Sequence, residues 1–212
     1  MHPELLARAL SGISSETTPS EFMIRAKISS KSIAESVLEF LTNKGIGTLC
    51  ENKILFSKED RLKIAILAIR LGCDIEQISK KLTWKDFESL ASKILKLYGY
   101  KTVINLIFSK PRMEIDVLGV NSAFAIAVDC KHWKNGSLPN LSRHAKRQKE
   151  RTKILLEKKG NIFSAIPIIL TLHCIIVRFI DGIPIVPIRE FRSFLHSLED
   201  NLPNVCVLYN KS

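Results

Sequence analysis

Two acidic residues and a lysine stand in apolar segments that have the pattern of neighbouring β-strands. Asp116 lies in the middle of Met113–Val120, and Asp129 and Lys131 stand at the end of Phe124–Lys131. Residues two apart point to the same face of a strand, so Asp129 and Lys131 share a face. A short turn between the strands would bring Asp116 close to Asp129. The spacing therefore predicts a cluster of two carboxylates and one ammonium group.

Such a cluster needs a partner, because a charge in an apolar strand costs several kcal/mol unless it is paired or bound to metal. Clustered carboxylates suit Mg²⁺ or Mn²⁺, which take oxygen ligands. Such an ion can activate a water and neutralise charge on a phosphate, and a neighbouring lysine can hold that water. The alternative is that Asp129 and Lys131 form a structural ion pair, with Glu114 and Asp116 solvated.

A basic helix is predicted after this cluster, over Pro139–Lys159. Residues 143–159 hold eight basic and two acidic side chains. Arg143, Arg147 and Arg151 fall on one face at i, i+4 spacing, and together with Lys146 they are the cationic positions that we expect to bind a phosphate backbone. The opposite, inner face consists of Leu141, Ala145, Gln148, Thr152 and Leu155. Gln148 either points at the carboxylates or is a buried amide bonded to the backbone, and the basic face is either a phosphate-binding surface or a solvated one.

The elements from residue 82 onward predict an α/β domain with a mixed sheet. Thr83 can cap a helix over Trp84–Tyr98, which Gly99 ends, and strand-like segments follow at Lys101–Phe108, Met113–Val120 and Phe124–Cys130. Further strands are expected after it, at Ile166–Leu170, Ile175–Phe179, Ile183–Ile188 and Val205–Tyr209, with a helix over Ile188–Leu198. The order is αβββαβ with additions, which places helices against a sheet.

The first part of the chain, residues 1–81, has the order of a winged helix-turn-helix. Ser11–Ser20 is expected to be a loop, and a helix follows Ser30. Two short strands and another helix come next. The candidate recognition helix, Lys31–Lys44, carries Glu35 and Glu39, which does not suit a phosphate-binding face. The alternative is a helical packing or dimerisation domain.

The charge of the chain supports this division. The 212 residues carry a net charge of +11, and the composition excludes a disordered chain, a collagen and a coiled coil. Residues 1–81 contribute +2 and residues 82–212 contribute +9. A protein this basic usually meets an anionic partner, most often nucleic acid. The excess lies in the part that carries the carboxylates.

The cysteines and the termini indicate the compartment. The five cysteines are odd in number, widely spaced and free of CxxC pairs, which favours a reducing cytoplasm over a disulfide or zinc framework. The sequence begins without the pattern of a signal peptide. Its most apolar stretch is interrupted by polar residues and shorter than a membrane-spanning helix. We therefore expect a cytoplasmic protein without a membrane segment.

The residues around the cluster resemble a known family. Arg112-Met-Glu-Ile-Asp116-Val and Val128-Asp-Cys-Lys-His-Trp133, preceded by Glu88 on a helix, are similar to the PD-(D/E)xK nuclease superfamily. Within it, they resemble Mrr-like restriction endonucleases and archaeal Holliday junction resolvases. The resemblance covers roughly residues 83–175.

The resemblance implies a restriction-endonuclease-like αβββαβ core and Mg²⁺-dependent hydrolysis of DNA. It implies that Asp116, Asp129 and Glu88 hold the metal and that Lys131 is the catalytic lysine. Glu114 and His132 are further candidates beside them. Two features depart from the pattern: Pro111 lies five residues before Asp116, and the second acid is an aspartate rather than the commoner glutamate.

The resemblance also implies a possible homodimer, since cutting two strands needs two sites. The alternative function is a catalytically inactive DNA-binding or regulatory protein that retains the nuclease fold.

Overall fold

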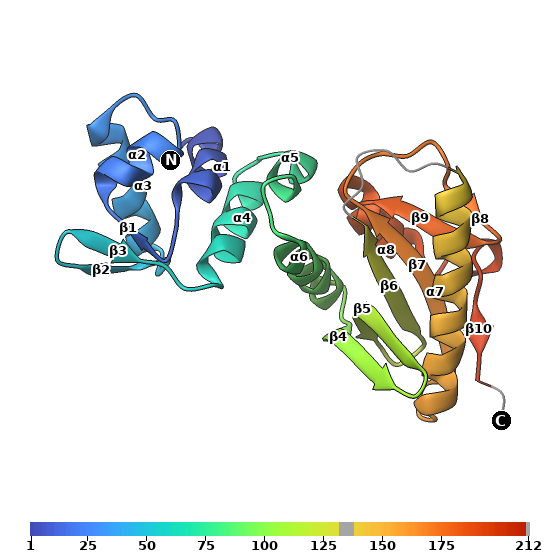
Figure 1. The fold of residues 1–212 in the computed structure, drawn as a ribbon. Helices are drawn as coiled ribbons and strands as arrows, with labels where there is room; N and C mark the ends of the chain where they lie inside the picture. Colours follow the sequence, from blue (N-terminus) through green and yellow to red (C-terminus); the bar gives the residue numbers. More distant parts are fainter. Residues whose placement is uncertain (132–137, 211–212) are drawn as a thin grey trace. The chain divides into compact units, whose positions relative to one another are not determined.

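The computed structural model describes residues 1–131 and 138–210 (Figure 1). The chain forms two compact units, Met1–Asp86 and Phe87–Ser212. The domains predicted from the sequence, 1–81 and 82–212, divide the chain close to the same point. Among the described residues, no helix is both long and apolar enough to cross a membrane.

The first unit combines small helices with a three-stranded antiparallel sheet. Its strands are ordered β1-β3-β2. Its elements are α1 (Pro3–Gly12), β1 (Glu16–Thr17), α2 (Pro19–Arg25), α3 (Lys31–Asn43), β2 (Thr48–Cys50), β3 (Lys53–Leu55), α4 (Asp60–Arg70) and α5 (Ile75–Ser79). The winged-helix interpretation of this unit stays a prediction.

The expected loop over Ser11–Ser20 is wrong, because β1 and the start of α2 lie inside it. Thr18 caps α2 with a capping box: its hydroxyl accepts from the Glu21 backbone N–H, and the Glu21 carboxylate accepts from the Thr18 backbone N–H. Such a box satisfies two backbone donors at the start of a helix. This helix of 7 residues is too short to show a clear apolar period.

The second unit is an α/β domain with a mixed sheet, as predicted. It begins within α6 (Trp84–Leu97), whose first residues belong to the first unit. The core order is α6, β4 (Lys101–Ser109), β5 (Arg112–Val120), β6 (Ala125–Lys131), α7 (Leu138–Lys158) and β7 (Ser164–Thr171). This is the αβββαβ order expected from the sequence. The added elements are β8 (Phe179–Ile180), β9 (Ile183–Pro187), η1 (Ile188–Glu190), α8 (Phe191–Ser197), η2 (Leu202–Asn204) and β10 (Leu208–Tyr209).

The main sheet runs β4-β5-β6-β7-β9-β8, and β10 pairs with β7. β6 pairs with β5 in antiparallel and with β7 in parallel orientation, so it lies in the middle of the sheet. All seven of its residues are buried. A central strand buried on both faces explains its nearly continuous apolar sequence.

Two predicted strands are mostly wrong. The segment expected as Ile175–Phe179 is a strand only from Phe179, and that expected as Val205–Tyr209 only from Leu208. β9 pairs in parallel with the end of β7, so the residues directly after β7 find no place beside it. Ile176 is 98% exposed as a result. Apolar composition alone could not show which segment pairs with β7.

Helix α7 packs on the sheet through its apolar side. Leu155 and Leu156 belong to a buried cluster with Leu118 of β5 and with Ala125 and Ala127 of β6. The predicted inner face is confirmed, since its five residues are all fully buried: Leu141, Ala145, Gln148, Thr152 and Leu155. The helix that carries the basic residues is therefore anchored against the strand that carries Asp129 and Lys131.

Candidate active site

The register of β5 and β6 brings the two predicted aspartates together. Val117 pairs with Val128, so Asp116 and Asp129 are the next residues along the same antiparallel ladder. The Cys130 backbone N–H donates to Asp116 Oδ2 over 2.7 Å. Asp116 is therefore held at the end of β6 by a contact to the backbone between Asp129 and Lys131.

Asp129 is buried and carries two ion pairs. Its Oδ2 lies 2.7 Å from Lys131 Nζ, and its Oδ1 accepts a hydrogen bond of 2.9 Å from Arg151 Nη1. The Asp129 side chain is only 2% exposed, so both contacts act where solvent screening is weak. Each oxygen of this carboxylate has a cationic partner.

Asp116 has no such ion pair in the described part of the chain, and its pKa reflects this. Burial, together with the negative charge of Asp129, raises the pKa of Asp116 from 3.8 to about 6. The Cys130 N–H and the charges of Lys131 and Arg151 act in the opposite direction. A carboxyl group with a raised pKa beside a second carboxylate is a frequent feature of functional sites.

Glu88 lies on α6 and is 4% exposed. Burial and the negative charges of Asp116, Glu88 and Asp129 raise the pKa of the Cys130 thiol well above its usual value. All three carboxylates therefore act on one point near the end of β6. Cys130 itself is fully buried, as its place between Asp129 and Lys131 predicts.

The remaining acidic and histidine candidates lie elsewhere. Glu114 is exposed on β5 and pairs in the ladder with Ile107 of β4, two residues from Asp116. His132 falls within 132–137, outside the described residues. The structure therefore brings together Asp116, Asp129 and Lys131, with Glu88 close by.

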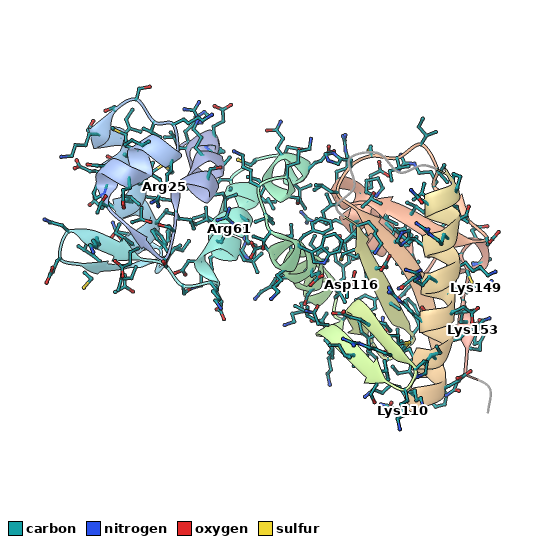
Figure 2. All side chains as sticks on the ribbon, viewed as in Figure 1. Arg25, Arg61, Lys110, Asp116, Lys149 and Lys153 are labelled. Atoms are coloured by element: carbon teal, nitrogen blue, oxygen red, sulfur yellow. The ribbon has the colours of Figure 1, made fainter. Side chains whose placement is uncertain are left out.

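The basic residues of α7 divide into two groups. Arg143, Lys146 and Arg147 are exposed, whereas the Arg151 side chain is 24% exposed and turned to Asp129. Figure 2 shows Lys149 and Lys153 on the side of the helix that points away from Asp116. The prediction grouped Arg151 with Arg143 and Arg147 from their i, i+4 spacing, but a spacing of four residues drifts around the helix, which has 3.6 residues per turn.

Gln148 is fully buried, and its Nε2 donates to the Ala127 carbonyl oxygen over 2.8 Å. Within the described residues, its Oε1 is a buried oxygen without a hydrogen-bond partner. Of the two interpretations left open by the sequence, the buried amide bonded to the backbone is the correct one for the Gln148 nitrogen.

Sequence reasoning missed the position of His144. Burial, followed by the positive charge of Lys131, lowers the pKa of His144, and the negative charge of Asp129 acts against this. His144 thus lies near the same ion pair as Arg151. The positions 144, 148 and 151 follow one side of a helix at spacings of four and three, and this period was the available signal.

The donor chemistry at this site fits a hard divalent cation, because the candidate ligands are carboxylates, and burial and the charge of Asp129 raise the pKa of Asp116. In their present arrangement they are not a finished site. Within residues 1–131 and 138–210, no three His, Cys, Asp or Glu side chains form a group that could hold an ion. An ion at Asp129 would meet the two cations that already pair with its oxygens.

The comparison with protein families bears directly on this cluster. Residues 79–152 match the family model Mrr_cat, described as a restriction endonuclease. The match confirms the predicted resemblance and supports a nuclease family for this segment. It contains Glu88, Asp116, Asp129, Lys131 and Arg151.

Other comparisons add less. The crystal structure of protein VC1899 from Vibrio cholerae has a TM-score of 0.46 and 14% sequence identity to this chain. The alignment covers 96% of this chain and 52% of that one, so the chain spans about half the length of that protein. None of the curated proteins matches the chain.

Proposed function

We propose that the protein is a DNA endonuclease that hydrolyses phosphodiester bonds and depends on Mg²⁺ or Mn²⁺. The observation that carries the proposal is the meeting of Asp116, Asp129 and Lys131 at the end of β6, under a helix rich in exposed cations. The family match of residues 79–152 supports it.

Each residue has a chemical task in this proposal. Glu88, Asp116 and Asp129 would hold the ion, which supplies an activated water and neutralises charge on the phosphate. Lys131 Nζ would orient the water and donate to a phosphate oxygen. Because Lys131 already contacts Asp129 Oδ2 at 2.7 Å, its ammonium group is placed at the cluster without further folding.

The exposed cations of α7 would bind the DNA backbone. Arg143, Lys146 and Arg147 are exposed on the helix that packs against β6, and the charges of Arg143 and Arg147 act on His144, as do those of Lys131 and Asp129. Phosphate contacts of this kind fix the position of the duplex without reading its sequence. We propose a cytoplasmic enzyme that acts as a homodimer, because two cuts need two sites.

The test is cleavage of a panel of duplex, flap, junction and methylated DNAs with Mg²⁺ or Mn²⁺. We expect the wild type to cut at least one member and a chelator to stop the reaction. Asp129→Ala and Lys131→Ala should each lower the rate by about a thousandfold. Glu114→Gln, on the same strand as Asp116 but exposed, is the matched control and should keep the activity. Intact DNA throughout the panel, with folded protein, would contradict the proposal.

A second candidate function is a DNA-binding or regulatory protein that keeps the nuclease fold without catalysis. The observation that favours it is the ion pairing of both Asp129 oxygens, which suits a structural role. Salt-dependent DNA binding that Lys131→Ala leaves unchanged, together with an absence of cleavage, would support this function over the first.

A further inference from the structure

Asp129 has two cationic partners, and the two differ in origin. Lys131 comes from the same strand, two residues away, and its side chain is 11% exposed. Arg151 comes from α7, twenty-two positions along the chain, and its side chain is 24% exposed. The lysine is thus a fixed neighbour, whereas the arginine reaches the carboxylate from another element and keeps part of its side chain in solvent.

The backbone that carries Arg151 is firmly held. Gln148 Nε2 donates to the Ala127 carbonyl oxygen of β6 over 2.8 Å, and Thr152 follows one turn later on the inner side of α7. Both side chains are fully buried. A rotation of the Arg151 side chain can therefore release Asp129 without moving the helix, since only its own χ angles need to change.

The charges near the end of β6 favour a metal ion that replaces Arg151 over one that binds while Arg151 stays in place. Among the described side chains at this point, Glu88, Asp116 and Asp129 carry three negative charges when ionised, and the two cations paired with Asp129, Lys131 and Arg151, carry two positive ones. A divalent ion that joined both cations would leave a positive excess, whereas one that replaced Arg151 would leave the group neutral. Removing a guanidinium from Asp129 Oδ1 also frees the oxygen that a metal requires.

We propose that Arg151 occupies the cation position on Asp129, and that a divalent metal binds there by displacing it. The released guanidinium then binds a phosphate oxygen of the substrate. This inference rests on the proposed function for the identity of the substrate, but not for the metal exchange itself. Arg151 is thus a positioning residue in the metal-free protein and a phosphate-binding residue in the working one.

The chemistry of arginine suits both positions. A guanidinium presents several donors in one plane and binds carboxylates and phosphates in the same geometry. DNA that holds the released side chain would remove the competitor from Asp129, so DNA and metal should strengthen each other's binding. A lysine at this position would offer a single point charge.

The experiment measures Mn²⁺ binding to the full chain without DNA, by calorimetry and by the electron paramagnetic resonance of free Mn²⁺. We expect Arg151→Gln to bind Mn²⁺ about tenfold more tightly than the wild type, because the competitor is gone. The control is Lys153→Gln, which removes the same charge from an exposed position of the same helix that points away from Asp116 (Figure 2), and it should change the affinity by less than about twofold. Equal or weaker Mn²⁺ binding by Arg151→Gln would overturn the proposal.

A second measurement uses the wild type and does not depend on the folding of a variant. Titration with Mg²⁺ should shift the Nε–H resonance of one arginine in the nitrogen-15 spectrum, and that resonance should be missing from the spectrum of Arg151→Lys. A Mg²⁺-bound protein in which the resonance stays unchanged contradicts the exchange.

The experiment distinguishes a failure of the metal exchange from a failure of the proposed nuclease function. Tighter Mn²⁺ binding by Arg151→Gln without cleavage of any DNA would keep the exchange and reject the nuclease. Cleavage by the wild type with unchanged Mn²⁺ binding in Arg151→Gln would do the reverse.

Discussion

Helices α3 and α7 are both amphipathic, but their exposed sides differ in charge. Each buries one side in its own unit. The buried side chains of α3 are all apolar: Ala34, Val37, Leu38 and Leu41. Those of α7 include Gln148 and Thr152 among the apolar ones. Both have hydrogen-bond partners that offset the cost of burying them, since Gln148 Nε2 donates to the Ala127 carbonyl oxygen and the Thr152 hydroxyl donates to the Gln148 carbonyl oxygen.

The exposed sides differ in charge. A groove of about 500 Å³ runs between α2, α3 and the β2-β3 hairpin of the first unit. Its lining includes Glu35 and Glu39 from α3 and Glu51 from the hairpin, with Lys31 as the basic member. Such a surface repels phosphate, whereas the exposed arginines of α7 attract it. The helix that a winged-helix interpretation would select for DNA is thus the less suited of the two.

The largest expected effect comes from neutralising the exposed cations of α7. The triple variant Arg143→Gln, Lys146→Gln, Arg147→Gln removes three phosphate partners. It should lower the slope of log affinity against log salt by about 2.7, and the affinity for duplex DNA roughly 500-fold near 0.1 M salt. Fluorescence anisotropy over a salt series measures both.

The matched control for this variant lies in the first unit. The triple Lys27→Gln, Lys31→Gln, Lys44→Gln removes three exposed lysines at and around α3. We expect a change in affinity of about threefold or less, since only long-range charge is lost. An equal loss of DNA affinity in the two triple variants would show that α3 and α7 contribute equally to DNA binding.

The second expected effect is on the free energy of unfolding. It tests whether the ionised Asp116 carboxylate on β5 destabilises the folded protein. Because the pKa of Asp116 is raised from 3.8 to about 6, the folded protein binds this proton more tightly than the unfolded chain does. The stability that the protonated carboxyl contributes is complete below about pH 4 and is lost as the pH rises through about 6. Asp116→Asn should therefore raise the free energy of unfolding at pH 7 by up to about 3 kcal/mol.

Urea denaturation between pH 4 and pH 7 checks this. The variant should show a flatter dependence of stability on pH than the wild type over this window, and the asparagine oxygen can still accept from the Cys130 N–H. Glu114→Gln, on the same strand but exposed, should leave the profile unchanged. A parallel profile for Asp116→Asn would mean that Asp116 is solvated in the folded protein.

Much of the second unit could be predicted, because its signals are local. The apolar segments, the cap at Thr83 and the break at Gly99 fixed α6 and the three strands after it, and alternation placed Asp129 and Lys131 on one face. In the structure the Thr83 hydroxyl accepts from the Asp86 N–H at the start of α6, and Gly99 takes the positive φ that ends a helix.

The rest depended on contacts between distant segments. The pairing of β9 with β7 leaves residues 172–178 outside any strand, and no local pattern shows which of two apolar segments pairs with β7. The contact of Arg151 with Asp129 depends on how α7 is rotated about its own axis against β6. It also depends on the length of the arginine side chain, which extends to the Asp129 carboxylate. For that reason a residue assigned to the outer face lies at the centre of the cluster.

The third expected effect compares the buried sides of α7 and α3 by their influence on stability and on Mn²⁺ binding. Gln148→Ala removes the donor to the Ala127 carbonyl oxygen and leaves a cavity, and should lower the free energy of unfolding by about 2 kcal/mol. It should also loosen the anchor of Arg151 and so alter Mn²⁺ binding. Val37→Ala on α3, which is equally buried, should cost a similar amount of stability but leave Mn²⁺ binding unchanged. A change in Mn²⁺ binding in both variants would show that stability alone governs it.

The smallest expected effect is also the most direct comparison of the exposed faces. The double variant Glu35→Gln, Glu39→Gln neutralises the acidic side of α3, and Glu150→Gln, Glu157→Gln does the same for exposed acidic residues of α7. Each pair removes the same charge. If DNA lies along α7, the α7 pair should raise the affinity for duplex DNA by about fivefold and the α3 pair by about twofold or less, because screening weakens a charge beyond about 10 Å from the phosphates.

The order of these two values matters more than their size. Both variants have the same net charge, so a general electrostatic attraction would raise the affinity equally. A larger gain in the α3 pair would mean that DNA contacts the groove of the first unit and that Glu35 and Glu39 restrain this contact in the wild type. Anisotropy at one low and one physiological salt concentration separates the cases, since only a charge close to the phosphates keeps its effect when salt is added.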